Sequence, residues 1–254
     1  MQSQSSVNLA DILLDPPTPH LEDGKYVSMR LTTDALKFIL ENVDKSCATL
    51  ETGCGLSTVV FALTGARHVS IAPIADEFEV LKKYCLDRDI PTAQIDFIAA
   101  GSQSILPTLD VPPLDLVLID GCHGFPAPYI DWFYTAGKMK KGGHVIIDDT
   151  WVWSCEILRD FLAEQRQWKF VTEYEHRTAI FEKLEDGSEW LEWTQQPFVA
   201  RSGRLSWVGG QMKYVDPDSL FSAKVARAFS DLKEGNFKAL REKVARRLSR
   251  ALSQ

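Results

Sequence analysis

Residues 48–62 read Ala-Thr-Leu-Glu-Thr-Gly-Cys-Gly-Leu-Ser-Thr-Val-Val-Phe-Ala, and this order predicts a strand, a glycine turn and a helix in succession. The strand is expected to be short and buried, and the helix to begin near Leu56. Gly53 and Gly55 matter because the polar groups of a ligand approach the backbone closely only where no Cβ intervenes. A strand that leads through such a turn into a helix binds nucleotides at the carboxyl edge of a parallel sheet.

The polar residues of this turn narrow the choice of ligand. Ser57 and Thr58 can satisfy free N–H groups at the start of the helix. Thr58 also occupies the position at which the dinucleotide-binding fingerprint requires a third glycine, which disfavours a nicotinamide cofactor. An ordinary glycine turn in an α/β protein with another ligand stays open at this point.

Further strands and helices alternate on both sides of this unit. Apolar runs predict strands at 68–72, 95–99, 114–120 and 144–149, and helical spacing predicts helices at 33–43, 76–88, 129–139 and 154–165. A turn at 141–143 is expected to lead into the strand at 144–149. Two close strands, 168–174 and 178–184, predict an antiparallel hairpin at one edge. The sequence therefore predicts an α/β fold, a doubly wound and mostly parallel sheet of seven strands with a terminal antiparallel hairpin.

Length and composition fit one α/β domain with extensions. The chain has 254 residues, of which 45% are hydrophobic and 25% charged, as in ordinary globular proteins. No apolar run is long enough to span a membrane, and residues 1–8 lack the features of a signal peptide. The five cysteines have no C-x-x-C spacing, which predicts reduced thiols in a cytoplasmic protein.

Charge and composition divide the chain into parts. We expect an extended lead-in over 1–30, a ligand-binding domain over 31–186 and an appendage over 187–254. The last 32 residues carry nine basic and three acidic side chains although the net charge of the chain is −7, so the body is acidic. An acidic body disfavours a nucleic-acid substrate. The segment 224–252 predicts a basic amphipathic helix, which can stay solvated, dock on the acidic body, join two subunits or touch an anionic membrane.

Three acids stand at the ends of predicted neighbouring strands. Asp120 follows the fourth strand, and Asp148 and Asp149 follow the fifth. Because the carboxyl ends of adjacent parallel strands meet at one edge of a sheet, these acids are expected to lie close together. Clustered carboxylates suit a hard divalent cation such as Mg²⁺, although each acid alone is more simply a cap or turn former.

The motif at Glu51 resembles the first motif of class I S-adenosylmethionine-dependent methyltransferases, an acidic residue followed by x-G-x-G. The resemblance covers about residues 30–185. It implies that S-adenosylmethionine binds at the glycine turn and at the strand ends beside it, through Glu51, Gly53, Cys54, Gly55, Ser57, Thr58, Ala72, Gly101, Ser102 and Asp120.

A second resemblance concerns Leu118-Ile-Asp-Gly-Cys-His123 together with Asp148-Asp149. These segments are similar to those of metal-dependent O-methyltransferases, a group that includes enzymes acting on sugar hydroxyls of macrolides. The resemblance implies that Asp120, Asp148 and Asp149 hold Mg²⁺, that His123 is the general base, and that Asp120 also takes part in catalysis. The implied acceptor is a hydroxyl of a sugar or other small natural product, with Tyr129, Trp151 and Trp153 as candidate walls of its pocket.

Two positions depart from the methyltransferase pattern. Ala72 stands where an acid usually contacts the ribose hydroxyls, and Gly101 stands where an acid usually lies near the adenine. Both departures favour an alternative, a methyltransferase-like binding module without catalytic activity. A metal-independent small-molecule methyltransferase, in which the three acids are structural, is the other alternative.

Overall fold

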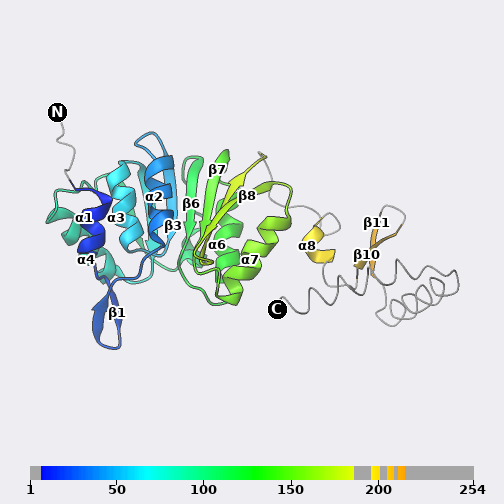
Figure 1. Ribbon diagram of the computed structural model, residues 1–254, viewed down its shortest axis with the longest axis horizontal. Helices are drawn as coiled ribbons and strands as arrows, with labels where there is room; N and C mark the ends of the chain where they lie inside the picture. The colour runs from blue at the N-terminus through cyan, green and yellow to red at the C-terminus, as the bar shows by residue number, and fades with distance from the viewer. Residues whose placement is uncertain (1–6, 186–195, 201–204, 209–210, 215–254) are drawn as a thin grey trace. The chain divides into compact units, whose positions relative to one another are not determined.

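The computed structural model describes residues 7–185, 196–200, 205–208 and 211–214. The chain divides into two units, Met1–Trp190 and Leu191–Gln254. Seven strands of the first unit form one sheet in the order β5-β4-β3-β6-β7-β9-β8 (Figure 1). Their bounds are β3 Ala48–Thr52, β4 Arg67–Ala72, β5 Ile95–Ala99, β6 Leu114–Ile119, β7 Met139–Ile147, β8 Trp168–Tyr174 and β9 Thr178–Lys183.

Five of these strands are parallel, and the last two form the antiparallel hairpin. β3 pairs in parallel with both β4 and β6, β4 with β5, and β6 with β7. β9 runs antiparallel to β7 and to β8. The predicted doubly wound sheet with a terminal antiparallel hairpin is confirmed.

Helices cover both faces of the sheet, which explains why the central strands β3 and β6 are almost wholly buried. Leu116 and Leu118 of β6 belong to the core beneath the helices on one face, whereas Val117 and Ile119 belong to the core on the other. The first core packs against α2 Thr33–Asn42, α3 Leu56–Thr64 and α4 Ala75–Leu86. The second packs against α6 Ala127–Ala136 and α7 Trp153–Glu164. A short helix, α5 Ser102–Ile105, follows β5 and is not predicted from the sequence.

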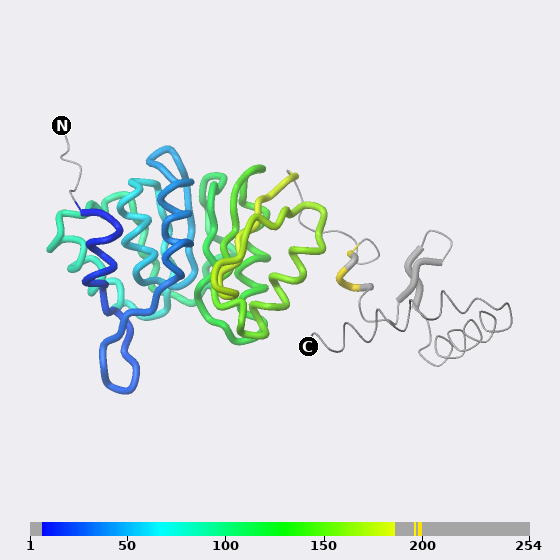
Figure 2. Tube along the Cα trace, viewed as in Figure 1, coloured from blue at the N-terminus to red at the C-terminus, as the bar shows by residue number. Residues whose placement is uncertain are grey.

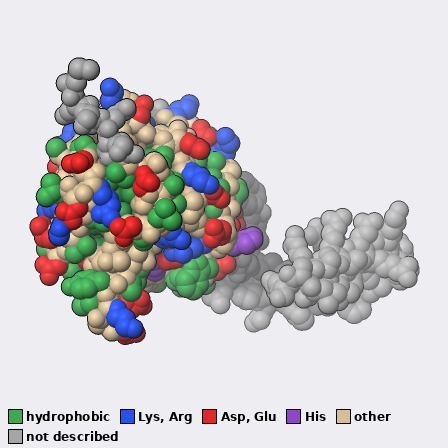
Figure 3. Space-filling model, turned by 60° about the vertical axis from the view of Figure 1, so that its left-hand side comes forward, with side chains coloured by type: hydrophobic (Ala, Val, Ile, Leu, Met, Phe, Trp, Pro, Cys, Tyr) green, Lys and Arg blue, Asp and Glu red, His purple; other side chains and the backbone are tan. Residues whose placement is uncertain are grey.

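We expected residues 1–30 to form an extended lead-in. The structure is not uniformly extended there. Leu9–Leu14 form the helix α1, because Asn8 and Asp11 make a reciprocal capping box at its start. β1 His20–Glu22 and β2 Lys25–Val27 then form an antiparallel hairpin. Figure 2 shows this hairpin projecting beyond the layered part of the unit. On the face drawn in Figure 3, acidic, basic and hydrophobic side chains are interspersed.

The expected turn at 141–143 is instead part of a strand. β7 begins at Met139, and its register with β6 shifts between Leu114 and Leu116. Gly142 has a φ of +80°, so the two glycines make an irregularity within the strand.

The second unit contains α8 Pro197–Ala200 and an antiparallel pair, β10 Leu205–Val208 and β11 Gln211–Tyr214. The expected basic helix at 224–252 lies outside the described residues. No helix in the described part of the chain is long and apolar enough to cross a membrane.

Candidate active site

A pocket of about 790 Å³ opens where the parallel strands end. Segments from distant parts of the chain line it, namely His20, 28–30, 52–55, Ser57, 71–74, Glu77, 101–103, 120–123, Asp149 and Arg177. The glycine turn and the acids at the ends of β6 and β7 therefore share one cavity. Its volume is that of a site for a cofactor-sized molecule.

Gly53 brings the ends of two strands into close contact. A Cβ on this residue would lie 2.2 Å from the carbonyl oxygen of Asp120, and its φ is +90°. Its N–H donates to the carbonyl of Ile71, with an N···O distance of 2.8 Å. At Gly55 a Cβ would lie 3.3 Å from the carbonyl oxygen of Met29. Both glycines thus allow neighbouring backbone segments to approach the turn.

Glu51 is turned into the protein and does not line the pocket. Its side chain is 1% exposed, and its carboxylate accepts hydrogen bonds of 2.7 Å from the hydroxyls of Ser57 and Ser70. Thr58 also donates to Glu51 and accepts the N–H of Gly55 at 3.0 Å. The predicted cofactor contacts Glu51 and Thr58 are therefore internal supports of the turn. Ser57 lines the pocket as predicted while it holds Glu51.

The other predicted cofactor contacts line the pocket. They are Gly53, Cys54, Gly55, Ala72, Gly101, Ser102 and Asp120. Two polar side chains that the sequence did not single out join them, His20 from the N-terminal hairpin and Glu77 from α4.

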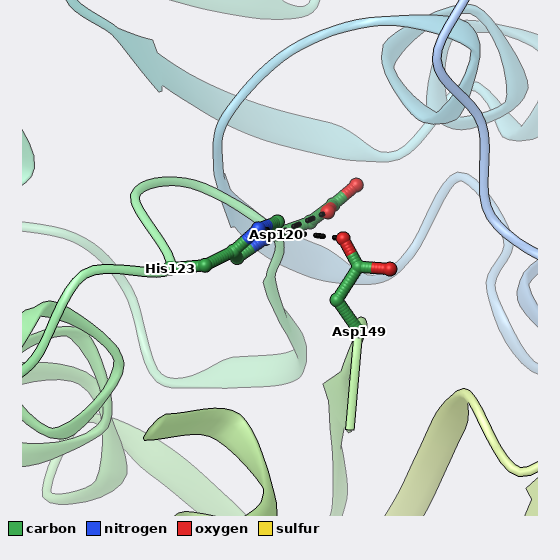
Figure 4. A group of neighbouring side chains, drawn as sticks. All are labelled: Asp120, His123 and Asp149. Carbon is green, nitrogen blue, oxygen red and sulfur yellow. Dashed lines mark ion pairs between the residues drawn. The ribbon is translucent and has the colours of Figure 1, made fainter. Parts of the chain in front are cut away.

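Asp120, His123 and Asp149 form a compact group at one part of the pocket (Figure 4). One nitrogen or oxygen atom from each lies within 4.8 Å of the others. His123 Nδ1 lies 3.3 Å from Asp149 Oδ2, and its Nε2 lies 3.7 Å from Asp120 Oδ1. The predicted proximity of Asp120 and Asp149 arises because β6 and β7 are neighbours in the sheet.

Asp148 does not join this group. It is 1% exposed, accepts a hydrogen bond from the Thr178 hydroxyl, and has Oδ2 3.2 Å from Nη2 of Arg177. Asp148 thus points toward Thr178 and Arg177, whereas Asp149, which follows the end of β7, has Oδ2 toward His123. The predicted set of three metal-binding acids thus has only two members at the pocket.

Arg177 also lines the pocket, although the sequence analysis did not identify it as a candidate site residue. It stands in the turn between β8 and β9, and its Nε lies 3.0 Å from Asp149 Oδ1. The indole N–H of Trp151 donates to the same oxygen at 2.8 Å. Asp149 has a left-handed φ of +51°, and these contacts hold it there with Oδ2 left toward His123.

Burial disfavours the ionised form of Asp120. Burial, reinforced by the charges of Asp148 and Asp149, raises the pKa of Asp120 to about 7. The nearby Asp120 carboxylate raises the pKa of His123 above its ordinary value. A proton or a cation bound at this group would offset the charge of its acids.

The family comparison supports the resemblance that the sequence suggested. Residues 50–150 match the sequence profile of a family described as a methyltransferase domain. This match and the shared fold support a likeness to class I S-adenosylmethionine-dependent methyltransferases. No curated protein sequence matches the chain.

Solved structures share the fold of this domain. Cofactor-bound Rv0187 from MTB has a TM-score of 0.54 at 16% identity, over 66% of this chain and 85% of that one. The O-methyltransferase TomG from Streptomyces achromogenes, involved in tomaymycin synthesis and solved with S-adenosylmethionine, has a TM-score of 0.53 at 14% identity, over 73% of this chain and 100% of that one. A protein from Corynebacterium glutamicum has a TM-score of 0.54 at 9% identity, over 65% of this chain and 85% of that one. At these identities the likeness shows the fold.

The residues of the pocket fit both groups that the sequence implied. The glycine turn, a cavity of about 790 Å³ and the polar side chains of Ser57 and Ser102 suit S-adenosylmethionine. Two carboxylates and an imidazole suit a divalent cation, and this donor set accepts Mn²⁺ as well as Mg²⁺.

Proposed function

We propose that this methyltransferase domain transfers the methyl group of S-adenosylmethionine to a hydroxyl oxygen of a sugar or other small natural product, with the assistance of a divalent cation such as Mg²⁺. One observation carries the proposal: the glycine turn and the group Asp120, His123 and Asp149 open into the same pocket. A donor and an acceptor held in one cavity are aligned for in-line transfer, which accounts for much of the barrier reduction in such reactions.

The two acids and the histidine have different roles in this proposal. Asp120 and Asp149 hold the cation, since Mg²⁺ is usually bound by one or two carboxylates with water completing its shell. When bound, the cation lowers the pKa of a hydroxyl that it contacts. His123 lies between the two carboxylates and accepts the hydroxyl proton, and Asp120 orients its ring through Nε2.

Exposed aromatic side chains near this group support a ring-shaped acceptor. Trp151 and Trp153 are 70% and 63% exposed, and the Phe125 and Trp153 rings lie 6.0 Å apart. Trp151 also contacts Asp149 directly. Tyr129, in contrast, is occupied within the protein, where its hydroxyl donates to the carbonyl of Ile157. TomG, an O-methyltransferase involved in tomaymycin synthesis, is a precedent for this fold in the synthesis of a natural product.

A metal-independent methyltransferase is the second candidate, and Arg177 favours it. Its guanidinium lies against both Asp148 and Asp149 and offsets their charge without a metal ion. Asp149 would then orient His123, and the imidazole would act alone.

One assay separates the two candidates. Purified protein is incubated with S-adenosylmethionine and a panel of hydroxylated sugars and natural products, and S-adenosylhomocysteine release is measured with excess chelator and with added Mg²⁺ or Mn²⁺. We expect turnover that the chelator suppresses and either cation restores. Full turnover in chelator would favour the metal-independent candidate, and no turnover with any acceptor would favour the binding module.

A further inference from the structure

The end of β4 leaves the cofactor's ribose without the usual acidic acceptor. Ala72 closes this strand, is 2% exposed and offers only its backbone. The ribose of S-adenosylmethionine carries two hydroxyl donors, which lose their water when the nucleoside is bound. Buried donors without acceptors cost free energy, so other atoms of the pocket must receive them. This inference rests on the cofactor assigned above.

Glu77 supplies a carboxylate at the pocket from the neighbouring helix. It stands in the first turn of α4, where its N–H donates to the carbonyl of Ile74 at 3.2 Å. Side chains on a helix tilt toward its N-terminus, which here adjoins the end of β4. The Glu77 side chain lines the pocket and is 12% exposed.

The carboxylate of Glu77 can accept more hydrogen bonds than the two contacts it makes in the structure. Oε1 lies 3.0 Å from His20 Nδ1, and Oε2 accepts from the Cys54 thiol at 3.5 Å. A carboxylate has about four acceptor sites, and no lysine or arginine is paired with Glu77 among the residues that the structure describes.

His20, which also lines the pocket, holds the Glu77 carboxylate in place. Because an ionised carboxylate only accepts, Nδ1 of His20 must carry the proton of their hydrogen bond. The other nitrogen, Nε2, lies against the glycine turn, 3.4 Å from where a Cβ on Gly55 would be. The N-terminal hairpin thereby reaches the cofactor pocket through one imidazole.

We propose that Glu77, positioned by His20, accepts the ribose hydroxyls of the cofactor in place of an acid at the end of β4. The N-terminal hairpin is then part of the cofactor site. The competing explanation is that the His20–Glu77 pair only fastens the hairpin to the domain.

Calorimetric titration with two ligands separates these explanations without using activity. The ligands are S-adenosylhomocysteine and its 2′,3′-dideoxy analogue, and the proteins are wild type, Glu77→Gln and the control Asp76→Asn, whose side chain is exposed on the same helical turn. In wild type and in the control, removal of the hydroxyls should weaken binding roughly 10- to 100-fold. In Glu77→Gln, whose amide keeps one accepting oxygen without charge, the same removal should cost several-fold less than in wild type. The ratio of the two affinities does not depend on how much of a variant is folded, because both ligands bind the same folded population.

The outcomes are distinct. An affinity ratio that is unchanged in Glu77→Gln would overturn this inference and leave the cofactor assignment intact. If both ligands also bind more weakly by the same factor, the His20–Glu77 pair only fastens the hairpin to the domain. Failure of wild type to bind S-adenosylhomocysteine would overturn the cofactor assignment and this inference together.

Discussion

Asp120, His123 and Asp149 form a group in which charge is only partly compensated. Arg177 lies against the side of Asp149 that faces away from His123, whereas Asp120 lies beside the imidazole. Burial and the charges of the other two acids raise the pKa of Asp120 to about 7. Protons and divalent cations should therefore compete for the same group.

Replacement of His123 by alanine tests its role as the general base. We expect turnover to fall by about 10²- to 10⁴-fold. S-adenosylhomocysteine and Mn²⁺ affinities should stay within about threefold, because in the proposal Asp120 and Asp149 hold the cation. Calorimetry and steady-state rates provide these measurements. Near-normal turnover would place the base elsewhere, and loss of Mn²⁺ binding together with turnover would make His123 a metal ligand.

The pH–rate profile adds a second check on His123. A base must be unprotonated to accept a proton, so activity should fall as the pH is lowered through the pKa of His123. The nearby Asp120 carboxylate raises that pKa, which moves the acid limb to higher pH, whereas a bound cation would move the limb to lower pH. The profile of kcat/KM should therefore shift to lower pH as Mg²⁺ is added. An acid limb that is the same with and without the cation would contradict this coupling.

Replacement of Asp120 by asparagine should stabilise the cation-free protein at high pH. The pKa of Asp120 is raised to about 7 in the folded protein, above the value of about 3.9 for an aspartate in an unfolded chain, so its ionisation lowers stability as the pH rises between these values. In chelator, Asp120→Asn should raise the melting temperature at pH 8 by about 2–4 °C and leave it nearly unchanged at pH 4. A lower melting temperature at pH 8 would show that the pair with His123 outweighs the repulsion.

At the scale of the elements, the site depends on how closely the ends of β3 and β6 approach. The turn after β3 touches the backbone of Asp120 at Gly53, so the cofactor and acidic parts of the pocket share one contact. A change at this contact should affect both parts.

Gly53→Ala should therefore destabilise the domain more than Gly55→Ala. The added Cβ would meet the backbone oxygen of Asp120 at 2.2 Å with φ at +90°, whereas at Gly55 the nearest backbone oxygen is 3.3 Å away. We expect Gly53→Ala to cost more than about 1 kcal/mol. Gly137→Ala is the matched control, because a Cβ there has no atom within 4 Å. Denaturant unfolding measures the order, and equal stability of the three variants would contradict it.

Comparison of the predicted and observed strands and helices shows which parts of the fold can be predicted from the sequence. The strands β3 to β7 follow from runs rich in apolar residues, because a parallel strand with helices on both faces is largely buried. The start of β7 is missed because two glycines usually mark a turn, whereas here they form an irregularity within a strand. α1 is missed although Asn8 and Asp11 carry its capping signal.

At the scale of the whole molecule, the pocket is assembled from parts that the sequence places far apart. The proximity of Asp120 and Asp149 follows from strand order alone. Three side chains reach the pocket from separate elements: Arg177 from a hairpin turn, Glu77 from a helix and His20 from the N-terminal hairpin. No local sequence pattern predicts that they line it. The sequence places Asp148 wrongly because the direction of a side chain at a strand end depends on the local backbone conformation, which the sequence pattern does not give.

The central claim is that one pocket holds the methyl donor beside a cation-binding pair of acids. A crystal structure with S-adenosylhomocysteine and Mn²⁺, with anomalous diffraction recorded for manganese, tests it most directly. We predict S-adenosylhomocysteine in the pocket above Gly53 and Gly55, and an anomalous peak within bonding distance of the Asp120 and Asp149 carboxylates. Ligand density elsewhere, or a filled cofactor pocket with no manganese at these two acids, would contradict the claim.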